Sequence, residues 1–86
     1  MKAVVVYKDD SEHARPVIEW LRDFYRQSGK KIDTLEPETR EGIDFCRLHD
    51  IVEYPTIVAM DNEGKPLQMW RGLPLPLINE VSYYVD

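Results

Sequence analysis

Residues 3–7, with the sequence AVVVY, form a continuous apolar run in which three of the five residues are valine. A half-buried strand alternates apolar and polar residues, whereas a run that is apolar at every position fits a strand covered on both faces. The run therefore predicts a central strand with other parts of the chain packed on both sides of it. At 86 residues the chain is expected to form one domain spanning residues 1–86.

An amphipathic helix is predicted directly after this strand. Apolar residues recur at helical spacing through residues 15–26, and Gly29 follows where a helix C-cap belongs. Because proline is tolerated only in the first turn of a helix, Pro16 places the predicted helix start near residues 11–14. Ser11, or an aspartate just before it, is the predicted N-cap.

The rest of the chain switches between strand and helix patterns. Residues 31–35 alternate polar and apolar, and residues 56–60 and 67–71 flank a glycine-containing turn, as the strands of an antiparallel hairpin do. Apolar residues within 38–50 lack a single clean stripe, which favours a short helix, and residues 77–85 repeat at helical spacing. The predicted order of elements is therefore β-α-β-α-β-β-α.

The balance of charges argues against several classes of partner. The chain carries 11 basic and 16 acidic residues, a net charge of −5, whereas nucleic acid and anionic lipid both require a positive face. No apolar run approaches the roughly 20 residues of a membrane-spanning helix, and the first residues lack a signal-peptide pattern, so a cytoplasmic protein is expected. One cysteine and two histidines predict neither a disulfide nor a metal centre, and no cofactor is expected.

The most specific local marks are Tyr54-Pro55-Thr56, at the start of the third predicted strand, and Gly72, after the fourth. Together with the order of elements, they resemble the thioredoxin-like superfamily, which includes thioredoxins and glutaredoxins, over nearly the whole chain. The resemblance implies an α/β fold with a central mixed four-stranded sheet flanked by three helices. It also implies a cis peptide bond before Pro55, because the family has a cis proline followed by threonine at this position.

The redox motif of that family, Cys-x-x-Cys after the first strand, is absent from this chain. In register, its two cysteine positions fall on Ser11 and Ala14, within the sequence S-E-H-A. Thioredoxins also carry an aromatic residue before the first cysteine and a buried aspartate in the preceding strand, and the matching positions here hold Asp10 and Val5. A thiolate is the nucleophile of disulfide exchange. The resemblance therefore implies a redox-inactive domain.

An enzyme remains the alternative hypothesis, and it is the less expected one. Ser11 is a candidate nucleophile or glutathione-orienting group with His13 as its base, and Cys46 is a candidate thiol for a peroxidase or transferase. However, serine at a helix start is ordinarily an N-cap, and residues two apart on a helix do not face one another. Glutaredoxins hold glutathione with an aspartate after Gly-Gly, which residues 71–74 (RGLP) lack. In family register, Cys46 replaces a small buried alanine, which favours structural packing.

The favoured function is binding of a protein or peptide at the former active-site face. In the family, the residue before the cis proline offers its backbone N–H and C=O to an extended peptide, and Tyr54 is that residue here. The next strand is expected to contribute Met69 and Trp70 to the same apolar patch. The predicted binding residues are Ser11, His13, Tyr54, Pro55, Thr56 and Gly72.

Two other interpretations of this region remain open. Tyr54 could serve only to pack against the first helix, with Trp70 in the core, or the former active face could be a contact in a weak homodimer rather than a ligand site. A monomer or a weak homodimer is expected. In the last turn of the second predicted helix, His49 is expected to be a favourable partner of the helix dipole.

Overall fold

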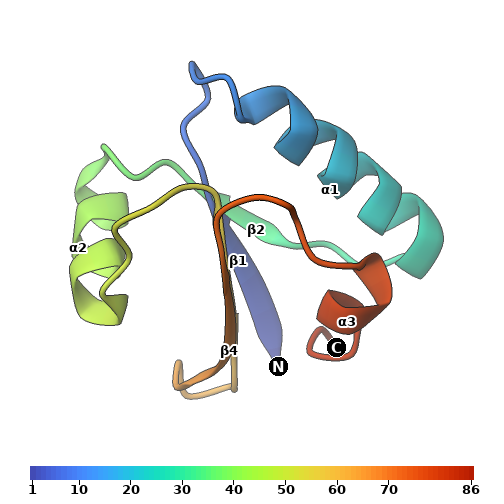
Figure 1. Ribbon diagram of the computed structural model, residues 1–86. Helices are drawn as coiled ribbons and strands as arrows, with labels where there is room; N and C mark the ends of the chain where they lie inside the picture. The colour runs from blue at the N-terminus through green and yellow to red at the C-terminus, as the bar shows by residue number, and fades with distance from the viewer.

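A mixed sheet of four strands, in the order β2-β1-β3-β4, runs through the middle of the protein (Figure 1). The computed structural model describes residues 1–86. β1 pairs in parallel with β2 and antiparallel with β3, which pairs antiparallel with β4. The predicted α/β fold and its element order are confirmed. The strands are β1 (Lys2–Val6), β2 (Asp33–Leu35), β3 (Thr56–Met60) and β4 (Pro66–Arg71).

Three helices cover the two faces of the sheet unequally. α1 (Ala14–Ser28) and α3 (Ile78–Ser82) lie on one face, and α2 (Arg40–His49) lies alone on the other (Figure 1). No helix is long and apolar enough to cross a membrane. Gly29 ends α1 with a φ of 71°, in the left-handed region expected of a C-cap glycine.

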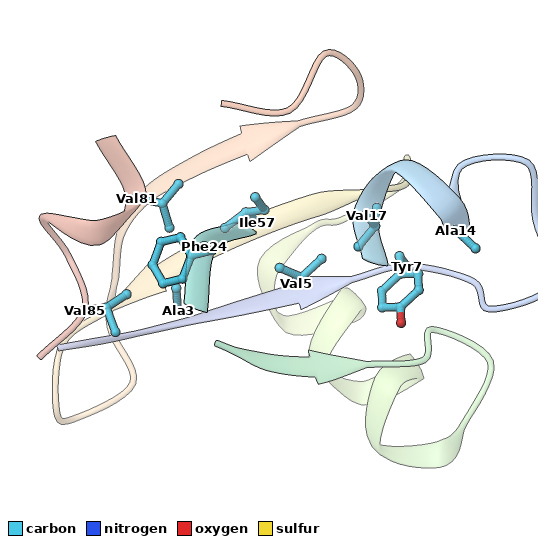
Figure 2. Close-up of a cluster of buried hydrophobic side chains, with 9 residues drawn as sticks. All are labelled: Ala3, Val5, Tyr7, Ala14, Val17, Phe24, Ile57, Val81 and Val85. Carbon is cyan, nitrogen blue, oxygen red and sulfur yellow. The ribbon is translucent and has the colours of Figure 1, made fainter. Parts of the chain in front are cut away.

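Alternate side chains of β1 enter two separate hydrophobic clusters, because neighbouring residues of a strand point to opposite faces. Both Val5 and Val6 are fully buried, Val5 on the side of α1 and α3 and Val6 on the side of α2. The prediction that residues 3–7 form a strand covered on both faces is confirmed. Figure 2 shows the side chains of the larger cluster, which are Ala3, Val5, Tyr7, Ala14, Val17, Phe24, Ile57, Val81 and Val85.

The N-cap of α1 differs from the prediction, although the helix starts within the predicted range of residues 11–14. The helix begins at Ala14, and its N-cap residue is His13, whose side chain makes no capping hydrogen bond. The hydroxyl of Ser11 instead donates to the carbonyl of Lys8 at 2.7 Å, within a pair of turns that precede the helix. The prediction of Ser11 or an aspartate as N-cap is therefore wrong, because a local turn uses the hydroxyl. The expectation that Pro16 lies in the first turn is confirmed.

α2 begins in close contact with the segment that follows β2. Thr39 is its N-cap, accepting from the N–H of Gly42 at 3.0 Å and donating to the carbonyl of Glu36 at 2.8 Å. A side chain at Gly42 has no room, since its Cβ would lie 1.9 Å from the carbonyl oxygen of Glu36. The contact fixes α2 against the loop that leads into it.

The C-terminal helix is shorter than its sequence pattern predicts. Residues 77–85 repeat at helical spacing, yet α3 ends at Ser82 and turns continue from there to the end of the chain. Val85 is nevertheless buried in the larger cluster. The N–H of Asp86 donates to the carbonyl of Met1 at 3.1 Å, so the two termini lie side by side (Figure 1).

Candidate functional site

Three loops emerge from one end of the sheet. The register pairs Val6 with Thr56, and Thr56 with Arg71, so the end of β1, the start of β3 and the end of β4 lie side by side. The connections that leave these residues therefore gather at this end, the upper one in Figure 1. We define the candidate face as residues 9–14, Tyr54-Pro55 and residues 72–74.

The segment before β3 is tied to the segment after β4. The Tyr54–Pro55 peptide bond is cis, and the carbonyl of Pro55 accepts from the N–H of Gly72 at 2.7 Å. Gly72 has a φ of 71°, and a Cβ there would lie 2.9 Å from a carboxylate oxygen of Glu53. The buried hydroxyl of Thr56 donates to the carbonyl of Glu53 at 2.7 Å. Thr56 and Gly72 thus hold the shape of the face and have little surface to offer a ligand.

Tyr54 keeps its backbone polar groups free. Neither its N–H nor its C=O has a hydrogen-bond partner within the chain. Because buried backbone groups are almost always paired, unpaired ones occur where water or a ligand reaches them. Tyr54 is half-buried, and it sits immediately before the fixed carbonyl of Pro55. These backbone groups are therefore available to water or to a ligand.

The side chain of Tyr54 packs on the α2 side of the sheet, and not against α1. Tyr54 borders the smaller cluster, which includes Cys46 of α2. Burial raises the pKa of the Tyr54 hydroxyl, the Cys46 thiol adds to the rise, and the Lys8 ammonium opposes it. Tyr54 also forms one wall of an open groove of about 360 Å³, whose apolar lining residues are Pro37, Ile43, Cys46, Ile51, Val52 and Tyr54.

The prediction that Met69 and Trp70 share one patch with Tyr54 is wrong for Trp70, and the alternative that placed Trp70 in the core is confirmed. Met69 and Trp70 are neighbours on β4, so their side chains point to opposite faces of the sheet. Met69 packs beside the smaller cluster, whereas Trp70 packs beside the larger one and meets the ring of Tyr84 with centroids 5.7 Å apart. Trp70 therefore belongs to the core on the side away from Tyr54. Because successive side chains of residues 67–71 point to opposite faces of the sheet, the sequence already placed Met69 and Trp70 on different sides.

Ser11 and His13 both bind the backbone of Lys8 and do not bind each other. The Ser11 hydroxyl donates to the Lys8 carbonyl, and Nε2 of His13 accepts from the Lys8 N–H at 3.1 Å. The imidazole also meets the edge of the Tyr7 ring, with centroids 6.4 Å apart. A serine nucleophile needs a base within hydrogen-bond reach, and the only imidazole nitrogen with a partner here is turned to the backbone.

Glu36 connects two loops, a role that the sequence analysis missed. One carboxylate oxygen accepts from the N–H of Asp9 at 3.2 Å, and the other accepts from the N–H of Glu38 at 3.0 Å. The carboxylate of Glu38 in turn pairs with the ammonium of Lys8 at 3.5 Å. The loop after β1 is thereby held to the segment before α2. Nothing in the sequence marks Glu36 beyond its position at the end of a strand.

Cys46 lies on the inner side of α2, in agreement with the packing interpretation. It is 8% exposed, and burial raises the pKa of its thiol, with the Tyr54 hydroxyl opposing the rise. A raised pKa leaves less of the reactive thiolate at neutral pH. These surroundings do not favour Cys46 as a catalytic thiol.

His49 lies in the last turn of α2 as predicted, but its surroundings favour the neutral imidazole. Burial lowers the pKa of His49, and its ring packs on Phe45 with centroids 4.4 Å apart. The expected role as a charged partner of the helix dipole is therefore not supported. Asp50 follows as the C-cap residue with a φ of 55°, in the left-handed region. No group of three or more His, Cys, Asp or Glu side chains is arranged to hold a metal ion.

Comparison with known proteins gives a match in structure only. No protein-family model matches the chain, and no curated protein matches it either. Among solved structures, thioredoxin 1 from the thermophilic eubacterium Thermosipho africanus TCF52B is similar, with a TM-score of 0.67 and 14% sequence identity. The match covers 98% of this chain and 89% of that one. The protein therefore has a thioredoxin-like fold, and its one cysteine lies on α2 rather than at the start of α1.

Proposed function

We propose that the protein binds an extended segment of a partner protein at the candidate face and does not exchange disulfides with it. The free N–H and C=O of Tyr54 carry this proposal, because a residue with both groups unpaired can form two backbone hydrogen bonds with an extended segment. Pro55 and Gly72 hold the edge in place through their hydrogen bond. A bound segment would then need little rearrangement of the domain.

Apolar surface beside Tyr54 supports the same proposal. The groove next to its ring is open, and Val52 on its wall is 80% exposed. On the other side of the edge, Leu73 is also exposed. An extended peptide places alternate side chains on opposite sides of its backbone, so the groove can receive an apolar side chain while its neighbours contact the loops.

The charges of the loops favour a cationic partner. The carboxylates of Asp10, Glu12 and Glu53 are exposed and form no ion pair within the chain. The protein as a whole carries a net charge of −5. Complementary charge raises association rates and discriminates against partners of like charge. Segments that alternate apolar and basic residues are therefore the preferred class.

The absence of a thiol pair supports binding without redox chemistry. The single thiol is buried on α2, and the two positions that start α1 in the family pattern hold Ser11 and Ala14. A lone reduced thiol is also usual for a protein of the cytoplasm, where we place this one. As before, we favour a monomer or a weak homodimer.

Amide shift mapping with matched peptides tests the proposal. A short peptide that alternates valine with lysine is expected to perturb the amides of residues 9–14, 54–56 and 72–74, with the largest shift at the Tyr54 N–H. A valine-glutamate peptide is expected to bind more weakly. Perturbations confined to other surfaces, or no binding by either peptide, would contradict the proposal.

A pair of tyrosine substitutions tests the position of the contact. Tyr54→Ala is expected to lower the affinity for the valine-lysine peptide by about tenfold or more, as for an aromatic contact at the centre of an interface. Tyr83→Ala is the control, since Tyr83 is 75% exposed and follows α3 on the far side of the domain. Equal losses of affinity in both variants would remove Tyr54 from the contact.

Labelling of Cys46 separates this proposal from a thiol enzyme. The thiol is expected to react slowly with a maleimide in the native protein and quickly after unfolding, because it is buried and its pKa is raised. Fast labelling of the native protein would favour the enzyme hypothesis instead.

A further inference from the structure

The loop between β1 and α1 is held by a hydrogen bond that only a neutral histidine can accept. Nε2 of His13 accepts from the N–H of Lys8 at 3.1 Å. A neutral imidazole has one acceptor nitrogen, so the proton of His13 must lie on Nδ1 while this bond exists. The His13 side chain is half-buried beside the ring of Tyr7, and this contact fixes the imidazole against the end of β1.

We propose that uptake of one proton by His13 breaks its hydrogen bond to the N–H of Lys8 and shifts the backbone there, which gives the candidate face two states. A proton from solvent occupies the lone pair of Nε2, so that both ring nitrogens become donors. The N–H of Lys8 then faces another N–H and loses its acceptor. Histidine is the side chain whose charge ordinarily changes between about pH 5 and 8, so a titration over this range tests the proposal.

The charged groups around the loop are mainly acidic, and two cations beside it are paired: Lys8 with Glu38, and Arg15 with Glu19. Burial and the neighbouring Asp9 raise the pKa of Tyr7, so its hydroxyl stays neutral throughout this range. The titratable groups of the elements that meet here are Tyr7, Lys8, Asp9, Asp10, Glu12, Arg15, Glu19, Glu36 and Glu38.

Two further contacts keep the change local. The N–H of Asp9 donates to Glu36, and the hydroxyl of Ser11 donates to the carbonyl of Lys8. Neither contact uses His13, and β1 and α1 are buried independently of the loop. The change is therefore confined to the backbone around Lys8, and the fold persists in both states.

Lys8 transmits the change to the candidate face. Its ammonium lies near Tyr54, where it opposes the rise in the pKa of that hydroxyl, and it pairs with Glu38 at 3.5 Å. Moving the backbone of Lys8 alters the charge and shape of the wall beside Tyr54. The effect on binding rests on the proposed function, whereas the loop transition itself does not.

A pH titration followed by nuclear magnetic resonance tests the transition. On lowering the pH from 8 to 5, the amide of Lys8 is expected to shift with the same midpoint as the ring of His13. The ring nitrogens at pH 8 are expected to show a proton on Nδ1. A Lys8 amide that stays constant while His13 titrates would overturn the inference, as would a proton on Nε2 at pH 8.

Glutamine substitutions at the two histidines provide matched variants, since the chain contains only His13 and His49. His13→Gln keeps a hydrogen-bond acceptor near the position of Nε2 but cannot titrate, so the loop amides are expected to become independent of pH. His49→Gln is expected to leave the transition unchanged. Persistence of the transition in His13→Gln would assign it to other groups. Core amides of β1 and β3 report whether each variant is folded.

Affinity for the valine-lysine peptide separates this inference from the proposed function. Between pH 7.5 and 5.5 the affinity is expected to change by about fivefold or more in the wild type and to stay constant in His13→Gln. If the loop changes with pH but no peptide binds at any pH, the proposed function is wrong and the loop transition stands. Binding at the face that is equally tight at both pH values would sink the coupling.

Discussion

The two faces of the sheet are covered very differently. On one side α1 and α3 enclose nine buried residues, and on the other α2 alone covers six. Val5 and Val6 are nevertheless both fully buried, so the single helix suffices to exclude water from the centre of its face. At the margin of this face α2 leaves apolar surface uncovered, and the groove beside Tyr54 stays open there. The difference suggests a division of labour, with stability concentrated on the side of α1 and ligand contact on the side of α2.

The largest expected effect is the loss of Phe24, the biggest fully buried side chain, which lies on the side of α1. Phe24→Ala is expected to lower the free energy of unfolding by about 3–5 kcal/mol, because it leaves a cavity between α1 and the sheet. Urea denaturation followed by circular dichroism measures the loss. If Phe24→Ala lowered the free energy of unfolding no more than Cys46→Ala does, stability would not be concentrated on the side of α1.

Substitution of a glycine on each side gives the next effect. Gly42→Ala is expected to cost about 3 kcal/mol, since the new methyl group would lie 1.9 Å from the carbonyl oxygen of Glu36 and force α2 to move. In Gly29→Ala at the end of α1 the new methyl group would have no neighbour within 4 Å. The variant is therefore expected to lose only the about 1 kcal/mol that alanine costs at a positive φ. Thermal denaturation of both variants tests the order. A larger loss in Gly29→Ala would show that the contact at Gly42 relaxes.

Two adjacent valines offer the closest comparison of the faces. Val5→Ala and Val6→Ala remove the same two methyl groups from one strand at equal burial. We expect a loss of about 2 kcal/mol for Val5 and about 1 kcal/mol for Val6, because the face with one helix can close around a cavity more easily. Equal losses in urea denaturation would mean that the second helix adds cover without adding rigidity.

The smallest expected effect is a dependence of stability on pH through His49. Burial lowers the pKa of His49, so the unfolded chain binds a proton there more readily than the folded chain does. The stabilising contribution is complete above the unfolded value near pH 6.5 and is lost as the pH falls toward the folded value. In a His13→Gln background, His49→Gln is therefore expected to flatten the decline in unfolding free energy between pH 7.5 and 5.5. An unchanged decline would remove this role.

The arrangement of strands was predictable because its signals are local. The unbroken apolar run of residues 3–7 and the turn between residues 60 and 67 each specify a strand or a hairpin without reference to the rest of the chain. The N-cap of α1 was mispredicted because Ser11 can cap a helix or close a turn, and only the position of the Lys8 carbonyl decides between them. Trp70 was misplaced because its strand was treated as one surface, although its alternation assigns two.

The candidate face itself was predictable only in outline. Tyr54-Pro55-Thr56 and Gly72 could be located by their resemblance to a known pattern, and the structure brings them together. The free backbone groups of Tyr54 and the bridge made by Glu36 depend on which loops meet in space. Periodicity in the sequence does not encode such contacts between loops, since the two loops are separated along the chain by a whole helix or more.

The hydrogen bond between Asp86 and Met1 fixes both chain ends at the pole of the domain away from Tyr54. An affinity tag, a fluorophore or a fused reporter can therefore be attached at either end without covering the candidate face. Several copies attached to one polymer by their chain ends would all present the candidate face outward. In such an array the peptide binding that we propose would be multivalent, so that weak single contacts would add up to slower release.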